Sequence, residues 1–417
     1  MPRSSSASAD RYETSRTSLL RRSGREWTVR AILAVIVGGL GYIAVTFSLA
    51  QVNARDDPAS AHHLAPYDGR ITAALAASRL IAGDQSQADT LARNALRQDS
   101  TAVTAVATLG LSAQARGDSI AARSLFGYAE ALSRRNEQAQ LWAIEDSVAH
   151  GDISGALHHY DIALRTSPRL NDTLFPVLAG ASADPAIRLA LIKTLTERPQ
   201  WGDGFLSFLG ARGPNPRATA QLLAGLRHAG VVVPGEATAN TINTLIAEGN
   251  ANDAWRYYAT LHPRADRSRS RDPHFTADRK ALSVLDWVTI DDGAISASIQ
   301  AGSRSGILDF AAPASVGGPL VRQLELLPAG DYRLTGHSIG IDQSADARPY
   351  WLIRCEDNRE LIRVALPNSA YAGGEHGGTF RVPPQCPIQT LELIARPSNA
   401  PAGTSGQIDR FLIEPLR

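Results

Sequence analysis

Cysteine, lysine and methionine are scarce in this sequence. Among 417 residues there are two cysteines and one methionine, and Lys193 and Lys280 are the only lysines among 42 basic residues. Nearly all positive charge is therefore arginine, which together with abundant alanine is typical of a GC-rich bacterial genome. The formal net charge of +1 gives no overall attraction to nucleic acid, so we expect no nucleic-acid partner.

Familiar catalytic and cofactor motifs are also absent. The sequence has no Walker A loop, no G-x-G-x-x-G and no H-E-x-x-H. We therefore expect a protein that is not an enzyme, with no catalytic residue, no metal and no cofactor; an unrecognised hydrolase is the least favoured alternative. Hydrophobic residues make up 44% of the chain, so most of it can bury a core, and its length predicts two or three domains.

One long apolar run lies near the start of the chain. Ala31–Ala50 contains 20 residues without a charge, enough to cross about 30 Å of hydrocarbon as a helix. Charged residues flank it on both sides: Arg21, Arg22, Arg25 and Arg30, then Arg55, Asp56 and Asp57. The excess of arginine on the first side predicts a single-pass helix over residues 31–50 in the bilayer of a bacterial inner membrane. Residues 1–30 are then a disordered cytoplasmic tail, and all later domains are periplasmic.

A cleaved signal peptide is the alternative to this anchor. Ser48-Leu49-Ala50 offers small residues at a plausible processing site. The apolar run and its charged leader are, however, long for a signal peptide, which favours an anchor that is kept.

Beyond residue 64 a motif repeats every 34 residues. Ala88, Ala122 and Ala156 stand at this spacing, and each follows a Gly-Asp dipeptide, at residues 83–84, 117–118 and 151–152. Small or aromatic residues recur four and seven positions after each alanine: Ala92, Phe126, Tyr160, Ala95, Ala129 and Ala163. This period predicts stacked helix–turn–helix units, with glycine in the turn because it tolerates the left-handed conformation.

The pattern resembles the tetratricopeptide repeat (TPR) family, most closely over residues 69–168. We predict an all-α, TPR-like superhelix over residues 64–263, with three regular repeats, a divergent middle and a late repeat near Ala254. The resemblance implies a partner-binding groove lined by the first helix of each repeat, at these positions: Arg70, Ala73, Ala77 and Leu80; Thr104, Ala107, Leu111 and Gln114; Gln138, Leu141, Glu145 and Val148.

These groove positions are mostly small and apolar. We therefore expect the partner to be a protein that inserts an amphipathic helix or a hydrophobic extended segment. The alternative is that this surface only packs the helices together.

After residue 263 the pattern changes. Residues 264–280 are rich in Arg, Asp and Ser and lack apolar periodicity, which predicts an exposed linker. From residue 281 to 417, short alternating segments between Gly/Pro turns predict an all-β antiparallel sandwich of eight to ten strands. Leu324 and Leu326 alternate with polar residues before Pro328–Asp331, and Tyr332–Leu334 alternates after it, which predicts a hairpin.

The segment around this turn resembles the hairpin of jelly-roll, carbohydrate-binding-like modules. Four aromatic residues are candidates for stacking on a sugar ring: Trp287, Tyr332, Tyr350 and Trp351. Neighbours on a strand point to opposite faces, so at most one of Tyr350 and Trp351 faces the core. The alternative is a sandwich that is structural or contacts protein.

Cys355 and Cys386 both lie in the last third of the chain. In an exported segment such a pair forms a disulfide, and we predict one here on the strength of the topology. Two buried free thiols are the alternative, because cysteine is among the most buried residue types.

The order of anchor, TPR array and sandwich resembles single-pass TPR proteins of alphaproteobacteria associated with envelope and exopolysaccharide systems. The likeness lies around residues 64–70, 132–135 and 141–146. It implies a multidomain, membrane-anchored periplasmic adaptor or scaffold that binds proteins. The alternative function is an envelope protein that binds an exported polysaccharide through its β sandwich.

Overall fold

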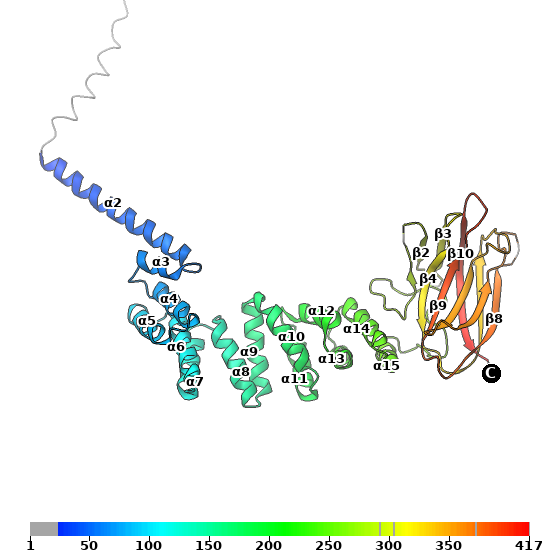
Figure 1. Cartoon of the computed structure of the whole chain (residues 1–417), viewed down its shortest axis with the longest axis horizontal. Coiled ribbons are helices and arrows are strands. Elements are labelled where there is room, and N and C mark those ends of the chain that lie inside the picture. The colour runs from blue at the N-terminus through cyan, green and yellow to red at the C-terminus, as the bar shows by residue number, and fades with distance from the viewer. Residues whose placement is uncertain (1–23, 292, 303–304, 372, 417) are drawn as a thin grey trace, which may run out of the picture. The chain divides into compact units, whose positions relative to one another are not determined.

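The computed structural model describes residues 24–291, 293–302, 305–371 and 373–416. Fourteen α-helices in these residues are followed by ten strands in two antiparallel sheets (Figure 1). The predicted fold class is confirmed: a candidate apolar helix, an α region and a β sandwich follow one another. The described residues form two compact units, which divide between His150 and Gly151.

The first helix is α2 (Gly24–Asn53), which is long and apolar enough to cross a membrane; a signal sequence near the N-terminus passes the same test. The predicted disordered tail is wrong for residues 24–30, which are helical. Glu26 lies in the first turn, where a carboxylate is favoured by the helix dipole. The rest of that predicted tail, residues 1–23, lies outside the described residues.

Six further helices complete the first unit: α3 (Pro58–Leu64), α4 (Gly69–Ile81), α5 (Gln85–Gln98), α6 (Val103–Ala115), α7 (Ser119–Leu132) and α8 (Glu137–Ala149). The repeated Gly-Asp dipeptides join the helices of a pair. Gly83 and Gly117 have φ of +86° and +77°, the left-handed conformation that ends a helix. Asp84 and Asp118 then cap the next helix, each accepting a hydrogen bond from a backbone N–H three residues later.

The repeated small residues lie where helices meet. Ala92 and Ala95 of α5 and Ala129 of α7 are fully buried. At Gly110 of α6, a Cβ atom would lie 2.9 Å from the ring of Phe126 on α7. The 34-residue motif therefore selects side chains small enough for close helix contact, with an aromatic ring filling the adjacent space.

The second unit begins with seven more α-helices and a short 3-10 turn: α9 (Ile153–Thr166), η1 (Pro168–Leu170), α10 (Asn171–Ala181), α11 (Pro185–Thr196), α12 (Gly202–Arg212), α13 (Pro216–His228), α14 (Gly235–Ala247) and α15 (Ala251–Leu261). Gly249 has φ of +75° and joins α14 to α15 as the glycines of the first unit join their pairs. Ala254 and Tyr258 of α15 are buried, as the late repeat predicts.

Each sheet of the sandwich contains five strands: β1 (Val288–Thr289), β4 (Gly318–Glu325), β9 (Gln389–Ala395), β6 (Tyr350–Cys355) and β7 (Glu360–Ala365) in one; β2 (Ser296–Gln300), β3 (Ile307–Ala312), β10 (Thr404–Pro415), β5 (Gly330–Ile339) and β8 (Glu375–Val382) in the other. Between the sheets, Trp287, Trp351 and Phe411 pack together, with the Trp351 and Phe411 ring centroids 4.2 Å apart. Cys355 at the end of β6 forms a disulfide with Cys386, and their Cα atoms are 5.5 Å apart.

The predicted hairpin is wrong, because β4 and β5 belong to different sheets. The chain crosses between the sheets at Leu326 and Leu327, which are buried in the sandwich. Two polar residues of β4 are also buried: Gln323 and Glu325 are 1% and 0% exposed. A turn sequence marks a change of direction, but it does not determine which sheet receives the next strand.

The predicted exposed linker is wrong in its middle. Phe275 is fully buried and belongs to the core of the sandwich, and Arg271 is 5% exposed. Ser270 exchanges hydrogen bonds with Ile413 of β10, at 3.1 and 3.0 Å. The Arg271 guanidinium lies 2.9 Å from Glu325. The positive charge of Arg271 can therefore be buried, because a carboxylate pairs with it.

Candidate functional site

The predicted groove residues lie on α4, α6 and α8 of the first unit, the helices with which the three predicted repeats begin. On α6, Leu111 is 38% exposed, and on α8, Val148 is 64% exposed. Trp142 of α8 donates a hydrogen bond to Gln114 of α6 at 3.2 Å, so these two helices are neighbours. We call Leu111, Gln114, Leu141, Glu145 and Val148 the first-helix face.

Two groove positions do not reach a surface. Ala73 and Ala107 are 0% and 2% exposed, so they pack helices together and offer no contact to a partner. The remaining predicted positions are exposed or half-buried: Arg70, Ala77, Leu80, Thr104, Gln138, Leu141 and Glu145. Arg70 is held 3.5 Å from Asp99, at the start of the array. The apolar part of the accessible surface therefore centres on α6 and α8.

Aromatic stacking and an ion pair join α8, which carries part of the first-helix face, to α7. Trp142 stacks on Phe126 with ring centroids 4.8 Å apart. On the side of α8, Asp146 is 2.7 Å from Arg123 of α7, and the hydrogen bond from Arg123 lowers the pKa of Asp146. These contacts hold α8 against α7.

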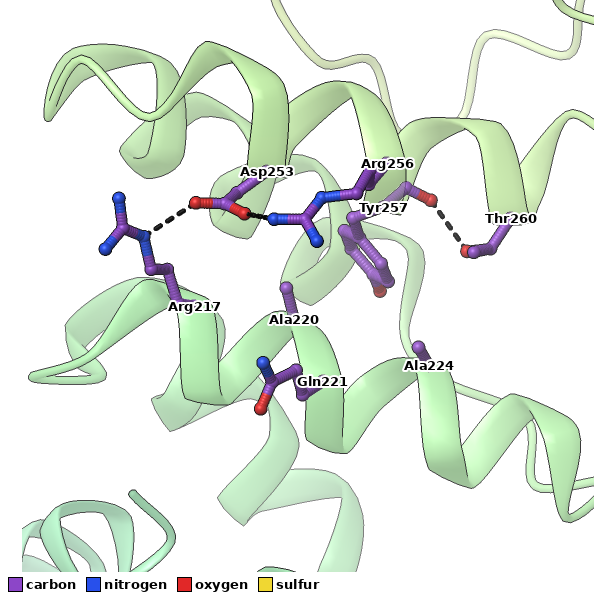
Figure 2. Close-up of a pocket in the computed structure, with 8 residues that line it drawn as sticks. All are labelled: Arg217, Ala220, Gln221, Ala224, Asp253, Arg256, Tyr257 and Thr260. Atoms are coloured by element: carbon purple, nitrogen blue, oxygen red, sulfur yellow. Dashed lines mark hydrogen bonds and ion pairs between the residues drawn. The ribbon is translucent and has the colours of Figure 1, made fainter. Parts of the chain in front are cut away.

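A separate pocket of about 160 Å³ lies between α13 and α15 of the second unit (Figure 2). Arg217 from α13 and Arg256 from α15 both reach Asp253, and the Arg217–Asp253 distance is 2.6 Å. Ala220 lies on the α13 side, and the buried ring of Tyr257 points from α15 towards α13. Burial raises the pKa of Tyr257, so this hydroxyl stays protonated at neutral pH.

This pocket was not predicted from the sequence. Its lining follows helical spacing on both sides, with Arg217, Gln221 and Ala224 on α13 and Asp253 and Thr260 on α15. That periodicity was visible in the sequence, but the pairing of these two helices was not. Two guanidinium groups share one carboxylate here, so the pocket is a small cationic recess.

The sandwich does not present the four candidate aromatic residues as a sugar-stacking surface. Trp287, Tyr332 and Trp351 are at most 3% exposed. Tyr350 is half-buried, as expected for a neighbour of the inward-facing Trp351, but two guanidinium groups cover its ring. Arg363 and Arg396 lie 4.6 and 4.5 Å from the ring centroid.

No three His, Cys, Asp or Glu side chains gather to hold a metal ion in the part of the chain that the structure describes. His158 and His159, adjacent on α9, have ring centroids 5.4 Å apart in an edge-to-face arrangement.

Several solved structures are similar to parts of this chain. The CBM22-1 xylan-binding domain of Paenibacillus barcinonensis Xyn10C is 11% identical, with 35% of this chain and 92% of that domain covered and a TM-score of 0.25. PilF of Pseudomonas aeruginosa is 14% identical, with 54% and 92% covered and a TM-score of 0.27. PilW, a type IV pilus biogenesis factor, is 17% identical, with 48% and 95% covered and a TM-score of 0.25.

These scores are too low to carry a functional argument. A scan of protein-family models finds no match to the chain, and a search of curated proteins finds none either.

Proposed function

We propose that this protein is a membrane-anchored adaptor that binds another protein on the first-helix face. Its location is the periplasmic side of a bacterial inner membrane, within an envelope or exopolysaccharide assembly. The partner contributes an apolar or amphipathic segment. The protein acts as a scaffold and catalyses no reaction.

The observation that carries this proposal is the exposure of apolar side chains on neighbouring first helices. Leu111 and Val148 are exposed on α6 and α8, and Gln114 and Glu145 stand beside them as polar neighbours. Isolated exposed apolar residues are common, but these lie on two helices joined by the Trp142–Gln114 hydrogen bond. An apolar centre with a polar rim is the usual composition of a protein-binding surface.

The contacts of α2 support an anchor that is kept. Ala50, the last residue of the candidate processing site, is fully buried and packs with Ala61 and Ile71. One residue further on, Gln51 donates a hydrogen bond to Asp68 at 3.0 Å. A protease needs an accessible, extended substrate, whereas this stretch is helical and packed against α3 and α4.

Glycan binding by the sandwich is the alternative function. The burial of Trp287, Tyr332 and Trp351 removes the aromatic platform on which that alternative was first based.

We expect Leu111→Glu to weaken capture of the partner at least tenfold, because a carboxylate at the centre of an apolar contact loses buried area and must be desolvated. The partner is first identified by co-purification from detergent-solubilised membranes, and its affinity for the purified variants is then measured. Tyr128→Glu is the matched control, since Tyr128 is 49% exposed on α7, a second helix.

Both variants should keep the urea midpoint of the parent protein. Equal affinity for Leu111→Glu and Tyr128→Glu would contradict the proposal. Unfolding of Leu111→Glu alone would identify Leu111 as a core residue and would contradict it as well.

A further inference from the structure

A cavity of about 310 Å³ lies inside the second unit, beside the C-terminal end of α15. Its walls come from α15, from the segment 262–287 and from β4 of the sandwich. The volume is within the range of small-molecule sites. Four arginines line it: Arg264, Arg269, Arg271 and Arg279.

The arginines differ in how many of their N–H donors already bind acceptors of the protein. Arg271 is occupied by Glu325, at 2.9 Å, and by the carbonyl of Leu285, at 2.9 Å. Arg269 has only loose ion pairs, 3.6 Å from both Asp266 and Glu414. Within the described residues, Arg279 donates one hydrogen bond, to the carbonyl of Trp287 at 3.1 Å. Since a guanidinium carries five N–H donors, Arg269 and Arg279 retain donors for a ligand.

The carboxylates around the cavity are engaged locally. Asp272 accepts hydrogen bonds from the backbone of Thr276 and Ala277, at 2.7 and 3.1 Å. Asp286 accepts from the backbone of Ser283, at 2.9 Å, and from the Tyr258 hydroxyl, at 3.0 Å. Burial lowers the pKa of Arg279, and the charges of Asp272 and Asp286 oppose this shift.

Gln323 lines the cavity with a hydrogen-bond acceptor that lacks a donor in the described part of the chain. It is 1% exposed and donates from Nε2 to the carbonyl of Leu285 at 3.0 Å. Its Oε1 is buried and has no hydrogen-bond partner among the described residues. A buried acceptor of this kind needs a donor. A simple anion such as sulfate has only acceptors, whereas a hydroxyl group supplies the missing donor.

We propose that this cavity binds a sugar acid, such as a uronate residue of an acidic polysaccharide. The carboxylate of the ligand accepts hydrogen bonds from Arg269 and Arg279, because planar guanidinium and carboxylate groups match each other. A ring hydroxyl donates to Gln323 Oε1. This site is separate from the first-helix face and does not depend on the protein-binding role.

The test is isothermal titration calorimetry on the full-length protein in detergent micelles. The affinities of three probes are measured at constant ionic strength. D-glucuronate carries both groups, D-glucose lacks the carboxylate and sulfate lacks the hydroxyls. We expect glucuronate to bind at least tenfold more tightly than either of the other two. If sulfate binds as tightly as glucuronate, the cavity is only a general anion site, and the proposal is overturned. If glucose binds as tightly as glucuronate, the arginines have no role, and the proposal is overturned as well. The absence of glucuronate binding at about 10 mM, an order-of-magnitude ceiling for a single sugar residue, also overturns it.

Three variants locate the site. Arg269→Gln should weaken glucuronate binding roughly tenfold, because it removes a charge-assisted contact from a half-exposed side chain. Gln323→Met should reduce the preference for glucuronate over sulfate, a ratio that remains measurable in a less stable protein. Arg381→Gln on β8 lies outside the cavity and should change neither value. Equal effects of Arg269→Gln and Arg381→Gln would overturn the assignment of the site.

Discussion

An Arg271→Ala variant is expected to lose about 3–5 kcal/mol of unfolding free energy, because it leaves a carboxylate buried without its cation. Glu325 is fully buried, and burial raises its pKa while Arg271 opposes that rise. The guanidinium also donates to the carbonyl of Leu285 and lies over the rings of Trp255 and Tyr258. Urea unfolding of the purified protein, followed by tryptophan fluorescence, measures the loss.

Arg269→Ala is the matched control, since Arg269 is two residues away and 49% exposed. Its loss should stay within about 1 kcal/mol, as is usual for exposed ion pairs. Replacing both Arg271 and Glu325 by methionine should cost less than Arg271→Ala alone, because no unpaired charge remains. If Arg271→Ala and Arg269→Ala are equally stable, the buried pair does not hold segment 264–280 to the sandwich.

Loss of the Cys355–Cys386 disulfide is expected to lower stability by about 3–4 kcal/mol, since it opens a loop with a sequence separation of 31 residues. The double variant Cys355→Ala/Cys386→Ala and the reduced parent protein should show the same decrease in urea midpoint. The reduced parent controls for strain or packing changes caused by the alanines.

The same disulfide reports the side of the membrane. With the proposed topology the sandwich lies in an oxidising compartment, so both cysteines should resist alkylation in intact cells until a reductant is added. The double alanine variant marks the position of unlabelled protein on a gel. Complete alkylation of the parent protein without reductant would place the sandwich in a reducing compartment and would contradict the periplasmic location.

Local signals in the sequence predicted the repeat architecture well. The Gly-Asp dipeptides act within a few residues of themselves, with Gly83 ending α4 and Asp84 capping α5. The buried alanines of α5 and α7 likewise follow a fixed period, so their role was visible without knowledge of the fold. In a repeat array each unit packs against the units next to it in the sequence, so most of its contacts can be predicted from a short stretch of the chain.

The sandwich was harder to predict because its decisive contacts join distant residues. The burial of Glu325 depends on Arg271, which is 54 positions earlier and lies in a segment that composition alone marks as exposed. Phe275 enters the core from that same segment. The pocket at Arg217 and Asp253 requires α13 and α15 to pair, and the sequence contains no sign of that pairing.

The most direct test of the adaptor role is site-specific photo-crosslinking in membranes of intact cells. A photoreactive amino acid at Val148, which is 64% exposed on α8, should give one discrete adduct with a partner protein, and the same residue at Leu111 should give the same adduct. At Arg93 on α5, whose side chain is 66% exposed on a second helix, the adduct should be absent. No adduct from Val148 and Leu111, or equal adducts from all three positions, would contradict a partner-binding first-helix face.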